Sequence, residues 1–171
     1  CVGCPDGSWC AGGASQPRPC SRGGYCLGNA SEPTPCPAGT YQGEESATSC
    51  TNCTVFSFCS AGSSAPTPCA AGTVGRGEGL EDASQCDTCP PGFWCSAGVA
   101  IACGASTYSA AVNATNEGNC TACPPNSRSP SGSTSIGDCT CDTNFYDKGS
   151  TMAGKVECVE CPVGSECNRS G

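Results

Sequence analysis

The sequence contains no histidine, one methionine and ten aromatic residues among its 171 positions. Other large apolar side chains are also scarce, with eight valines, two leucines and two isoleucines. Burial of apolar surface must offset roughly 1–2 kcal/mol of backbone entropy per residue. So few large apolar residues therefore cannot build an ordinary hydrophobic core. Without histidine there is no Ser–His or Cys–His dyad, and no paired carboxylates are framed by apolar residues. We expect a protein that is not an enzyme, with no catalytic residue and no cofactor.

Basic residues are few as well. Seven Lys and Arg stand against fifteen Asp and Glu, which gives a net charge of −8 with no basic run. Phosphate backbones and anionic membrane surfaces bind clustered Lys and Arg, so we expect no nucleic-acid partner. The most apolar stretch, Val99 to Cys103, is far shorter than the ~20 residues of a membrane span, so we expect no membrane insertion in this segment. The chain opens at Cys1 inside a cysteine pattern, and we expect a piece of a longer mature protein.

Cysteine, in contrast, is abundant, at 21 residues. This exceeds the roughly 8–10% at which a secreted disulfide scaffold becomes the default interpretation. The 24 glycines and 14 prolines add turns and interrupt helices. The chain must therefore be held by covalent bridges, and we expect an extracellular or cell-surface location.

Five Cys-x2-Cys pairs raise the possibility of zinc sites. From Cys53 to Cys158, neighbouring complete pairs lie 31 to 35 residues apart with other cysteines between them. The two pairs of a zinc ribbon are often separated by about 15–20 residues. A thioredoxin-like redox site would need one activated pair on a βαβ scaffold. We therefore expect structural disulfides and no metal.

Two kinds of half-module alternate along the chain. The first has the spacing Cys-x5-Cys-x9-Cys, as in Cys53-TVFSF-Cys59 and on to Cys69. The second starts with a Cys-x-x-Gly-Thr-Tyr-like turn and closes on Cys-x2-Cys, as from Cys36 to Cys53. The period is 36, 34 and 38 residues between successive closing cysteines, Cys50, Cys86, Cys120 and Cys158. The predicted units are 1–35 (partial and irregular), 36–68, 69–102, 103–140 and 141–171 (truncated).

One aromatic residue keeps the same place in most half-modules, five residues after a cysteine. It would cover a disulfide and form a miniature core, or alternatively line a binding face. No helix has room between these cysteines, and the segments resemble short two-stranded ribbons with Gly-rich turns. We expect a linear array in which each ribbon touches only its neighbours. The aromatic residues are Trp9, Tyr25, Phe58, Trp94, Tyr41, Tyr108 and Tyr146.

The segment 103–158 resembles the cysteine-rich, EGF-like region of ephrin receptors. The motif is Cys120-TA-Cys123-PPNSRSPSGSTSIGD-Cys139-T-Cys141-DTNFY. The Cys-Pro-x-Gly-Thr-Tyr start at Cys36 is similar to tumour-necrosis-factor-receptor modules, and related repeats occur in large surface or flagellar-hair glycoproteins of protists and algae. The resemblance implies a small disulfide-rich fold: a linear array of EGF-like or ephrin-receptor-like modules with short β-ribbons and little or no helix. Receptor function is not implied, since the ligand-binding and kinase domains of that family are not seen.

Spacing constrains the disulfide pairing without fixing it. Sequential pairing would give Cys36–Cys50, Cys53–Cys59 and Cys69–Cys86, and onward. The EGF resemblance favours crossed pairing within four-cysteine units instead: Cys36–Cys53, Cys50–Cys59, Cys69–Cys89, Cys86–Cys95, Cys103–Cys123 and Cys120–Cys139. The cysteines expected in bridges are Cys36, Cys50, Cys53, Cys59, Cys69, Cys86, Cys89, Cys95, Cys103, Cys120, Cys123, Cys139, Cys141 and Cys158.

Asn-x-Ser/Thr triplets suggest N-linked glycans on an exported surface. Asn52 and Asn119 have cysteine in the middle position, so early disulfide closure would limit their occupancy. We expect a structural segment of a glycosylated stalk, matrix or filament that self-associates, or alternatively a receptor or adhesion ectodomain that binds a protein partner. The five candidate asparagines are Asn29, Asn52, Asn113, Asn119 and Asn168.

Overall fold

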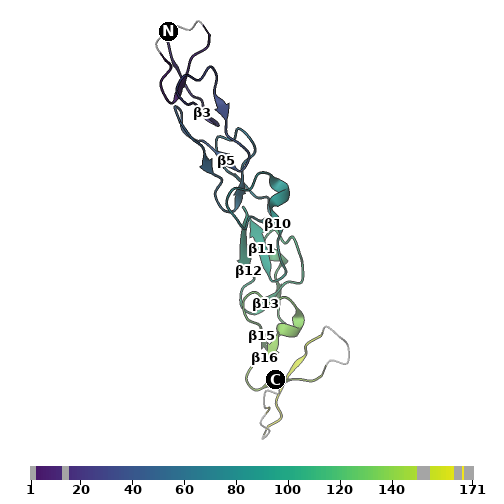
Figure 1. Ribbon diagram of the computed structural model, residues 1–171. Helices are drawn as coiled ribbons and strands as arrows, with labels where there is room; N and C mark the ends of the chain where they lie inside the picture. Colours follow the sequence, from purple (N-terminus) through teal and green to yellow (C-terminus); the bar gives the residue numbers. More distant parts are fainter. Residues whose placement is uncertain (1–2, 13–15, 150–154, 164–166, 168–171) are drawn as a thin grey trace. The chain divides into compact units, whose positions relative to one another are not determined.

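The structure, a computed structural model, describes residues 3–12, 16–149, 155–163 and 167. Its eighteen short strands pair consecutively into nine two-stranded sheets (Figure 1). This confirms the expected small disulfide-rich array of β-ribbons in linear series. The strands are β1 (Ser8–Trp9), β2 (Arg18–Pro19), β3 (Gly24–Tyr25), β4 (Thr34–Pro35), β5 (Thr40–Tyr41), β6 (Thr51–Asn52), β7 (Ser57–Phe58), β8 (Thr67–Pro68), β9 (Thr73–Val74), β10 (Asp87–Thr88), β11 (Phe93–Ser96), β12 (Val99–Ala102), β13 (Thr107–Tyr108), β14 (Thr121–Ala122), β15 (Ser127–Arg128), β16 (Thr140–Cys141), β17 (Phe145–Asp147) and β18 (Cys158–Glu160).

One hairpin makes up each half-module. Its first strand typically ends on the recurrent aromatic residue, and its second strand lies just before the next cysteine. In β3–β4, for example, Tyr25 is antiparallel to Thr34. Pro35 closes the second strand, where its missing N–H is tolerated because a two-stranded ribbon consists only of edges. Two-residue strands are too short to be stable alone, so each hairpin needs its bridge and its neighbours.

A tight turn precedes the first strand of every hairpin. The third residue after the starting cysteine has a positive φ, and the next residue donates its N–H to the carbonyl three residues back, as Gly24 does to Ser21 (3.2 Å). A positive φ at the third turn residue alone is the geometry of a type II turn, which favours glycine. We call this third residue the turn position. It is occupied by Gly7, Gly23, Gly39, Phe56, Gly72, Gly92, Ser106, Asn126 and Asn144.

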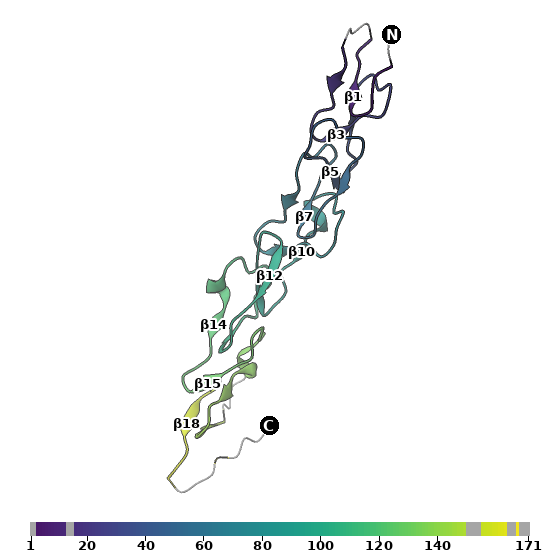
Figure 2. The same cartoon turned by 90° about the vertical axis from the view of Figure 1, so that its left-hand side faces the viewer.

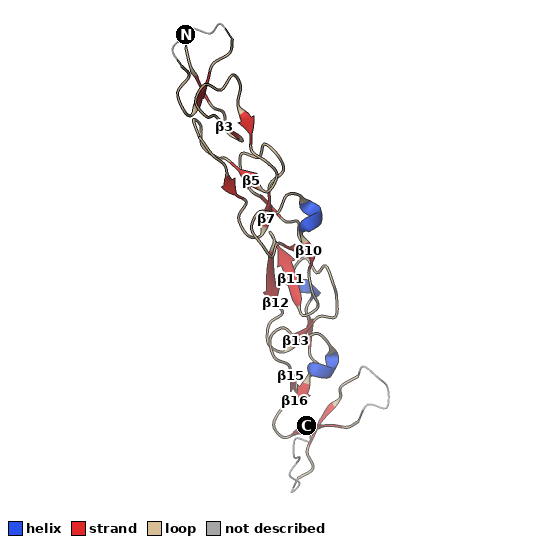
Figure 3. Ribbon diagram, in the orientation of Figure 1, coloured by secondary structure: helices blue, strands red, loops and turns tan. Residues whose placement is uncertain are grey.

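Helix is limited, in the described residues, to three 3-10 turns of three residues each (Figure 3). They are η1 (Ala83–Gln85), η2 (Glu117–Asn119) and η3 (Ile136–Asp138). Each lies directly before the closing cysteine of a long half-module. The side chain of its last residue folds back to accept a backbone N–H near the start of the turn, which satisfies groups that so short a helix leaves unpaired.

The core consists of disulfides. Eleven of the thirteen buried apolar residues are cysteines, and Val74 and Ala114 complete the set. The recurrent aromatic residues are only half-buried, and Tyr146 is exposed. The buried core is therefore made mainly of half-cystines, and the expectation that aromatic side chains form it is wrong.

The contacts divide the chain into two compact units. The first contains residues 1–87 and 97–99, and the second contains residues 88–96 and 100–171. Within the first unit the hairpins from β1–β2 to β7–β8 follow one another in sequence order in both views (Figures 1 and 2). None of the described residues forms a helix long and apolar enough to span a bilayer.

Candidate functional site: the contacts that join successive half-modules

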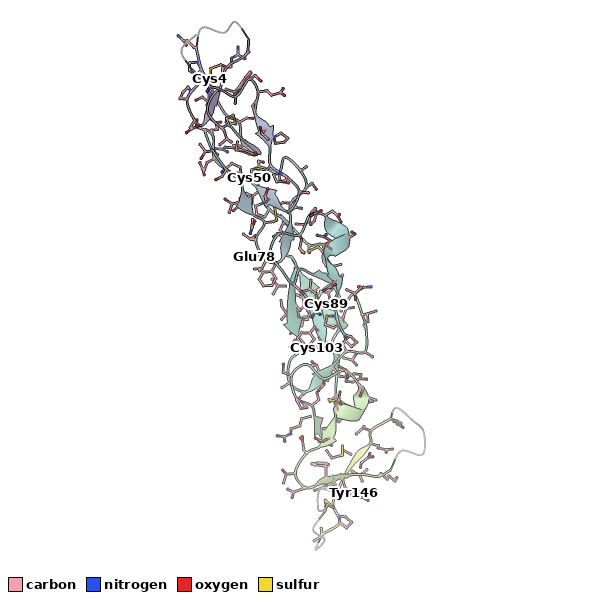
Figure 4. All side chains as sticks on the ribbon, in the orientation of Figure 1. Cys4, Cys50, Glu78, Cys89, Cys103 and Tyr146 are labelled. Atoms are coloured by element: carbon pink, nitrogen blue, oxygen red, sulfur yellow. A yellow bond between two sulfur atoms is a disulfide. The ribbon has the colours of Figure 1, made fainter. Side chains whose placement is uncertain are left out.

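Ten disulfides close the half-modules, and all of them follow the sequential scheme. Their Cα–Cα distances of 5.5 to 6.0 Å lie in the usual range for bridges. Figure 4 labels four of the bridged cysteines, of which Cys4, Cys89 and Cys103 start half-modules and Cys50 closes one. The pairs are Cys4–Cys10, Cys20–Cys26, Cys36–Cys50, Cys53–Cys59, Cys69–Cys86, Cys89–Cys95, Cys103–Cys120, Cys123–Cys139, Cys141–Cys158 and Cys161–Cys167. Cys1 lies outside the described residues.

The crossed pairing favoured by the EGF resemblance is therefore wrong. The reason lies in the Cys-x2-Cys pairs. Strand β6 occupies the two residues between Cys50 and Cys53, so the chain is extended there. In an extended chain, residues three apart point to opposite faces. Cys50 turns back to its own half-module, and Cys53 faces forward to start the next one. With each such cysteine in a bridge, no group of three or more metal-ligating side chains is assembled in the described part of the chain.

Backbone hydrogen bonds join most half-modules to the next. Between the half-modules that start at Cys20 and Cys36 there are three, which we call the seam. The Gly23 N–H donates to Gln42 O (2.8 Å), and the Cys26 N–H to Ala47 O (2.9 Å). The Ser46 N–H donates in the opposite direction, to Cys20 O (2.8 Å). At roughly 0.5–1.5 kcal/mol net for each bond, a seam supplies a few kcal/mol without any side chain.

The same three bonds recur at four other junctions. Those junctions join the half-modules that start at Cys4 and Cys20, Cys36 and Cys53, Cys89 and Cys103, and Cys103 and Cys123. The residue that donates back to the starting cysteine of the preceding half-module always has a positive φ. We call it the loop position. It is occupied by Asn29, Ser46, Gly62, Gly79, Asn113 and Gly132.

A second contact reaches one half-module further, so the expectation that each ribbon touches only its neighbours is wrong. The carbonyl oxygen of the loop position lies against the glycine at the turn position two half-modules earlier, so that a Cβ there would clash. Gly79 O lies 2.6 Å from the place of a Cβ on Gly39, and Gly62 O is as tight against Gly23. Sequence reasoning identified the Cys-x-x-Gly turn but missed the loop position and the contact between the two positions. The signal for the contact was the glycine that recurs three residues after a starting cysteine.

The set of three bonds is incomplete at two junctions, with two bonds between the half-modules that start at Cys53 and Cys69 and one between those that start at Cys69 and Cys89. In the described part of the chain, the bonds are missing altogether where the sequence shortens Cys-x2-Cys to Cys139-Thr-Cys141. Cys141 now lies inside strand β16 opposite Ser127, and the Asp142 N–H takes the place that a starting cysteine holds elsewhere, donating to Asn126 O (2.8 Å). A one-residue shift turns the side chain of Cys141 to the other face of the ribbon. Among the described residues no seam bond joins the half-modules that start at Cys123 and Cys141. A cleft of about 400 Å³ lies there instead, lined in part by Pro124, Ile136 and Val156.

The candidate asparagines fall into three structural settings. Asn29 and Asn113 are exposed and occupy the loop position, with φ of 64° and 58°. Asn52 is exposed on β6. Asn119 uses its side-chain oxygen to accept the N–H groups of Thr115 (3.1 Å) and Asn116 (3.3 Å), and so caps η2. Asn168 lies outside the described residues.

Two carboxylates have perturbed acidity, and both cap 3-10 turns. Backbone N–H donation, from Ser135 first and then Thr134, lowers the pKa of Asp138. Hydrogen bonding to Ser84, through its side chain and then its backbone, lowers the pKa of Asp82. Asp82 is exposed and Asp138 is half-buried, and both shifts come from local capping hydrogen bonds.

One turn position carries an exposed apolar side chain. Phe56 has a φ of 69° and is 41% exposed, next to Val55 at 42%. Its backbone lies against Gly75 and Gly98, which leaves no room for a Cβ on either glycine. An aromatic residue in the left-handed region is uncommon and costs roughly 1–2 kcal/mol, so this departure needs a reason outside the turn itself.

No model of a known protein family matches the chain. The ten bridges, the consecutive hairpins and the near absence of helix in the described residues place it in the general class of small, cysteine-rich repeat proteins.

Proposed function

We propose that this chain is an extracellular structural segment of a surface stalk, matrix or filament protein, built from EGF-like or ephrin-receptor-like modules. The observation that carries the proposal is the seam. At five junctions a half-module uses three of its backbone N–H and C=O groups to bind the next, so the side chains there are left free to vary. Repeats joined in this way extend by addition of further units. A part whose main contacts are to its own kind suits a mechanical or spacing role.

The compartment follows from the bridges. Ten disulfides persist in an oxidising environment and are rare in the cytosol. The scarcity of large apolar residues means that a reduced chain would have little to hold it together. Export to the cell surface or beyond is therefore part of the proposal.

The same proposal makes the chain a non-enzyme. The carboxylates whose pKa is lowered, Asp82 and Asp138, are engaged as caps on short helical turns. Their lowered pKa keeps them ionised at neutral pH, which is the opposite of what a general acid needs.

A receptor or adhesion ectodomain is the second candidate, and Phe56 is the observation that favours it. An exposed aromatic side chain beside the exposed Val55 is the type of anchor that protein partners bury. Backbone strain kept at an exposed site points in the same direction.

The parent protein isolated from its native source separates the two functions. An antibody raised against this chain should label intact, unpermeabilised cells or their surroundings, and negative-stain images of the labelled material should show stalks or filaments with regular contacts. Labelling confined to the cell interior would overturn the extracellular proposal. Isolated molecules, with partner binding that is lost in Phe56→Gly, would favour the second candidate. Glycine is the commonest residue at the turn position, so this variant should fold.

A further inference from the structure

We infer that the loop position is a recurring attachment site for N-linked glycans, occupied at Asn29 and Asn113, whereas Asn119 serves as a helix cap and stays bare. The inference rests on the proposed export of the chain. It goes further in two ways. It predicts from the place of each asparagine in the fold which sequons carry a glycan, and it predicts which other loop positions would become glycosylation sites if they were changed to asparagine.

The backbone of the loop position is held by hydrogen bonds, and the residue is exposed where it is asparagine, although Asn29 Oδ1 lies close to Gly3. The Asn113 N–H donates to Cys89 O (3.0 Å), and the carbonyl of the next residue, the buried Ala114, accepts the Cys95 N–H (2.9 Å). Asn29 is held in the same way by Cys4 (2.8 Å). Both side chains are exposed. A sugar on either one therefore projects into solvent without touching the hydrogen bonds that join the half-modules.

A second observation points to a covering group at the same two loops. Apart from Val163, the most exposed large apolar side chains in the described residues are Leu27 at 58% and Val112 at 59%. Leu27 lies two residues before Asn29, and Val112 lies directly before Asn113. Apolar surface gains free energy when it is removed from water. The C–H face of a first N-acetylglucosamine ring would cover these side chains, which the protein leaves bare.

Asn119 has a different structural role. Its side-chain oxygen caps η2, and the equivalent last residue of η3 is Asp138, which accepts the N–H groups of Thr134 (2.8 Å) and Ser135 (3.0 Å). Asp138, like Asn119, directly precedes a bridged cysteine, but as an aspartate it forms no sequon. The cap is therefore a requirement of the fold at this place, and the Asn119-Cys120-Thr121 triplet arises from it.

The attachment needs a named co-reactant, a lipid-diphosphate-linked oligosaccharide, and the transferase of a secretory pathway. The Asn Nδ2 forms a bond to the anomeric carbon of the sugar. The bond from that carbon to the diphosphate oxygen breaks, the lipid diphosphate leaves, and the Nδ2 proton passes to a base of the transferase. No oxidant or reductant takes part.

The same register supplies vacant sites. Ser or Thr stands two residues after the loop position at Ser46, Gly62 and Gly132, so only the asparagine is missing. Asparagine tolerates the left-handed region better than other residues with a Cβ. A Cβ at Gly62 or Gly132 would meet nothing closer than 3.9 Å. The three vacant triplets are Ser46-Ala47-Thr48, Gly62-Ser63-Ser64 and Gly132-Ser133-Thr134.

The test is to secrete the 171-residue chain from a eukaryotic cell line and count glycans by intact mass before and after amidase treatment. Within the described sequons we expect two glycans, at Asn29 and Asn113, because Asn119 is a helix cap and closure of the Cys53–Cys59 bridge limits occupancy at Asn52. Asn113→Gly and Thr115→Ala should each remove one. Glycine occupies the loop position elsewhere, so the first variant keeps its backbone geometry. Asn119→Asp, which copies Asp138, should leave the number unchanged, and Ser46→Asn should add one without changing the secreted yield or the disulfides.

Loss of a glycan in Asn119→Asp, or no loss in Asn113→Gly, would overturn the assignment. Retention on a hydrophobic-interaction column tests the covering role. Asn29→Gly with Asn113→Gly should be retained longer than the wild type, and this difference should shrink when Leu27 and Val112 are both serine. An equal difference in both backgrounds would refute coverage. If the recombinant sites carry sugar but the native protein does not, the proposed export fails and the site assignment stands.

Discussion

The carbonyl oxygen of Gly79 lies 2.6 Å from the point where a Cβ of Gly39 would stand. These two glycines belong to half-modules that are separated by a third, so the contact couples units that are not adjacent along the chain. The relationship is not symmetric. A Cβ on Gly79 would find its nearest neighbour, Gly39 O, at 3.8 Å. Both residues have a positive φ, of 82° and 74°. They therefore share the same backbone requirement and differ only in the room available for a Cβ.

This asymmetry predicts that Gly39→Ala destabilises the first unit more than Gly79→Ala does. Both variants incur roughly 1–2 kcal/mol for a Cβ in the left-handed region. Only Gly39→Ala adds a clash, worth about 1–3 kcal/mol when the surroundings must shift. Amide hydrogen exchange with the disulfides intact measures the effect at the seam donors Gln42 and Cys59, which both variants keep. Equal loss of protection in the two variants would show that the close contact has no energetic weight.

Asp138 predicts a pH-dependent local opening. Hydrogen bonds from Ser135 and Thr134 lower the pKa of this carboxyl below its ordinary value of 3.8. A depressed pKa in the folded state means that the stabilisation is complete above the ordinary value and is lost as the pH falls through the folded value. We therefore expect the protection factors of the Thr134 and Ser135 amides to drop in strong acid while the bridges hold the rest.

Asp138→Asn is the matched control for that experiment. Asn119 performs the same capping role in η2 with an amide oxygen, so the variant keeps the acceptor and loses the titration. Its protection factors should not change with pH. If the variant and the wild type open together in acid, the cap is not what controls this turn.

The sequence predicts the repeat and its register, because a covalent bridge at every half-module forces regular spacing. It also predicts the place of each aromatic residue, which ends the first strand of most hairpins. The sequence does not settle the disulfide pairing, because spacing alone allows Cys36 to pair with either Cys50 or Cys53. The decisive fact is the extended strand between Cys50 and Cys53, which separates their side chains.

The seam was beyond the sequence for a different reason. Its bonds are made by backbone groups, which carry no residue-type signal. Only the left-handed positions leave a trace, as glycine at Gly23 or Gly39. Phe56, Ser106 and Asn126 blur that trace because they adopt the same φ without being glycine.

Burial predicts the order in which the bridges are reduced. Both cysteines of Cys20–Cys26 and of Cys53–Cys59 are fully buried, whereas those of Cys141–Cys158 are half-exposed. Exposed bridges react faster with a reductant. Limiting phosphine at low pH, followed by alkylation and mass spectrometry, should open Cys141–Cys158 well before Cys20–Cys26. Simultaneous opening would contradict a core built from the buried bridges.

The central claim is that every bridge closes a single half-module, and one digestion tests it directly. Trypsin cuts after Arg76 and Arg128, and a protease specific for the N-terminal side of Asp cuts before Asp82 and Asp87. In the unreduced protein, digested after free thiols have been blocked, the peptide 82–86 carries Cys86 as its only cysteine. Our structure predicts that this peptide is linked through Cys69 to the segment that ends at Arg76, and not to the segment 87–128. Linkage of 82–86 to 87–128, through Cys95, would establish the crossed pairing and contradict the account.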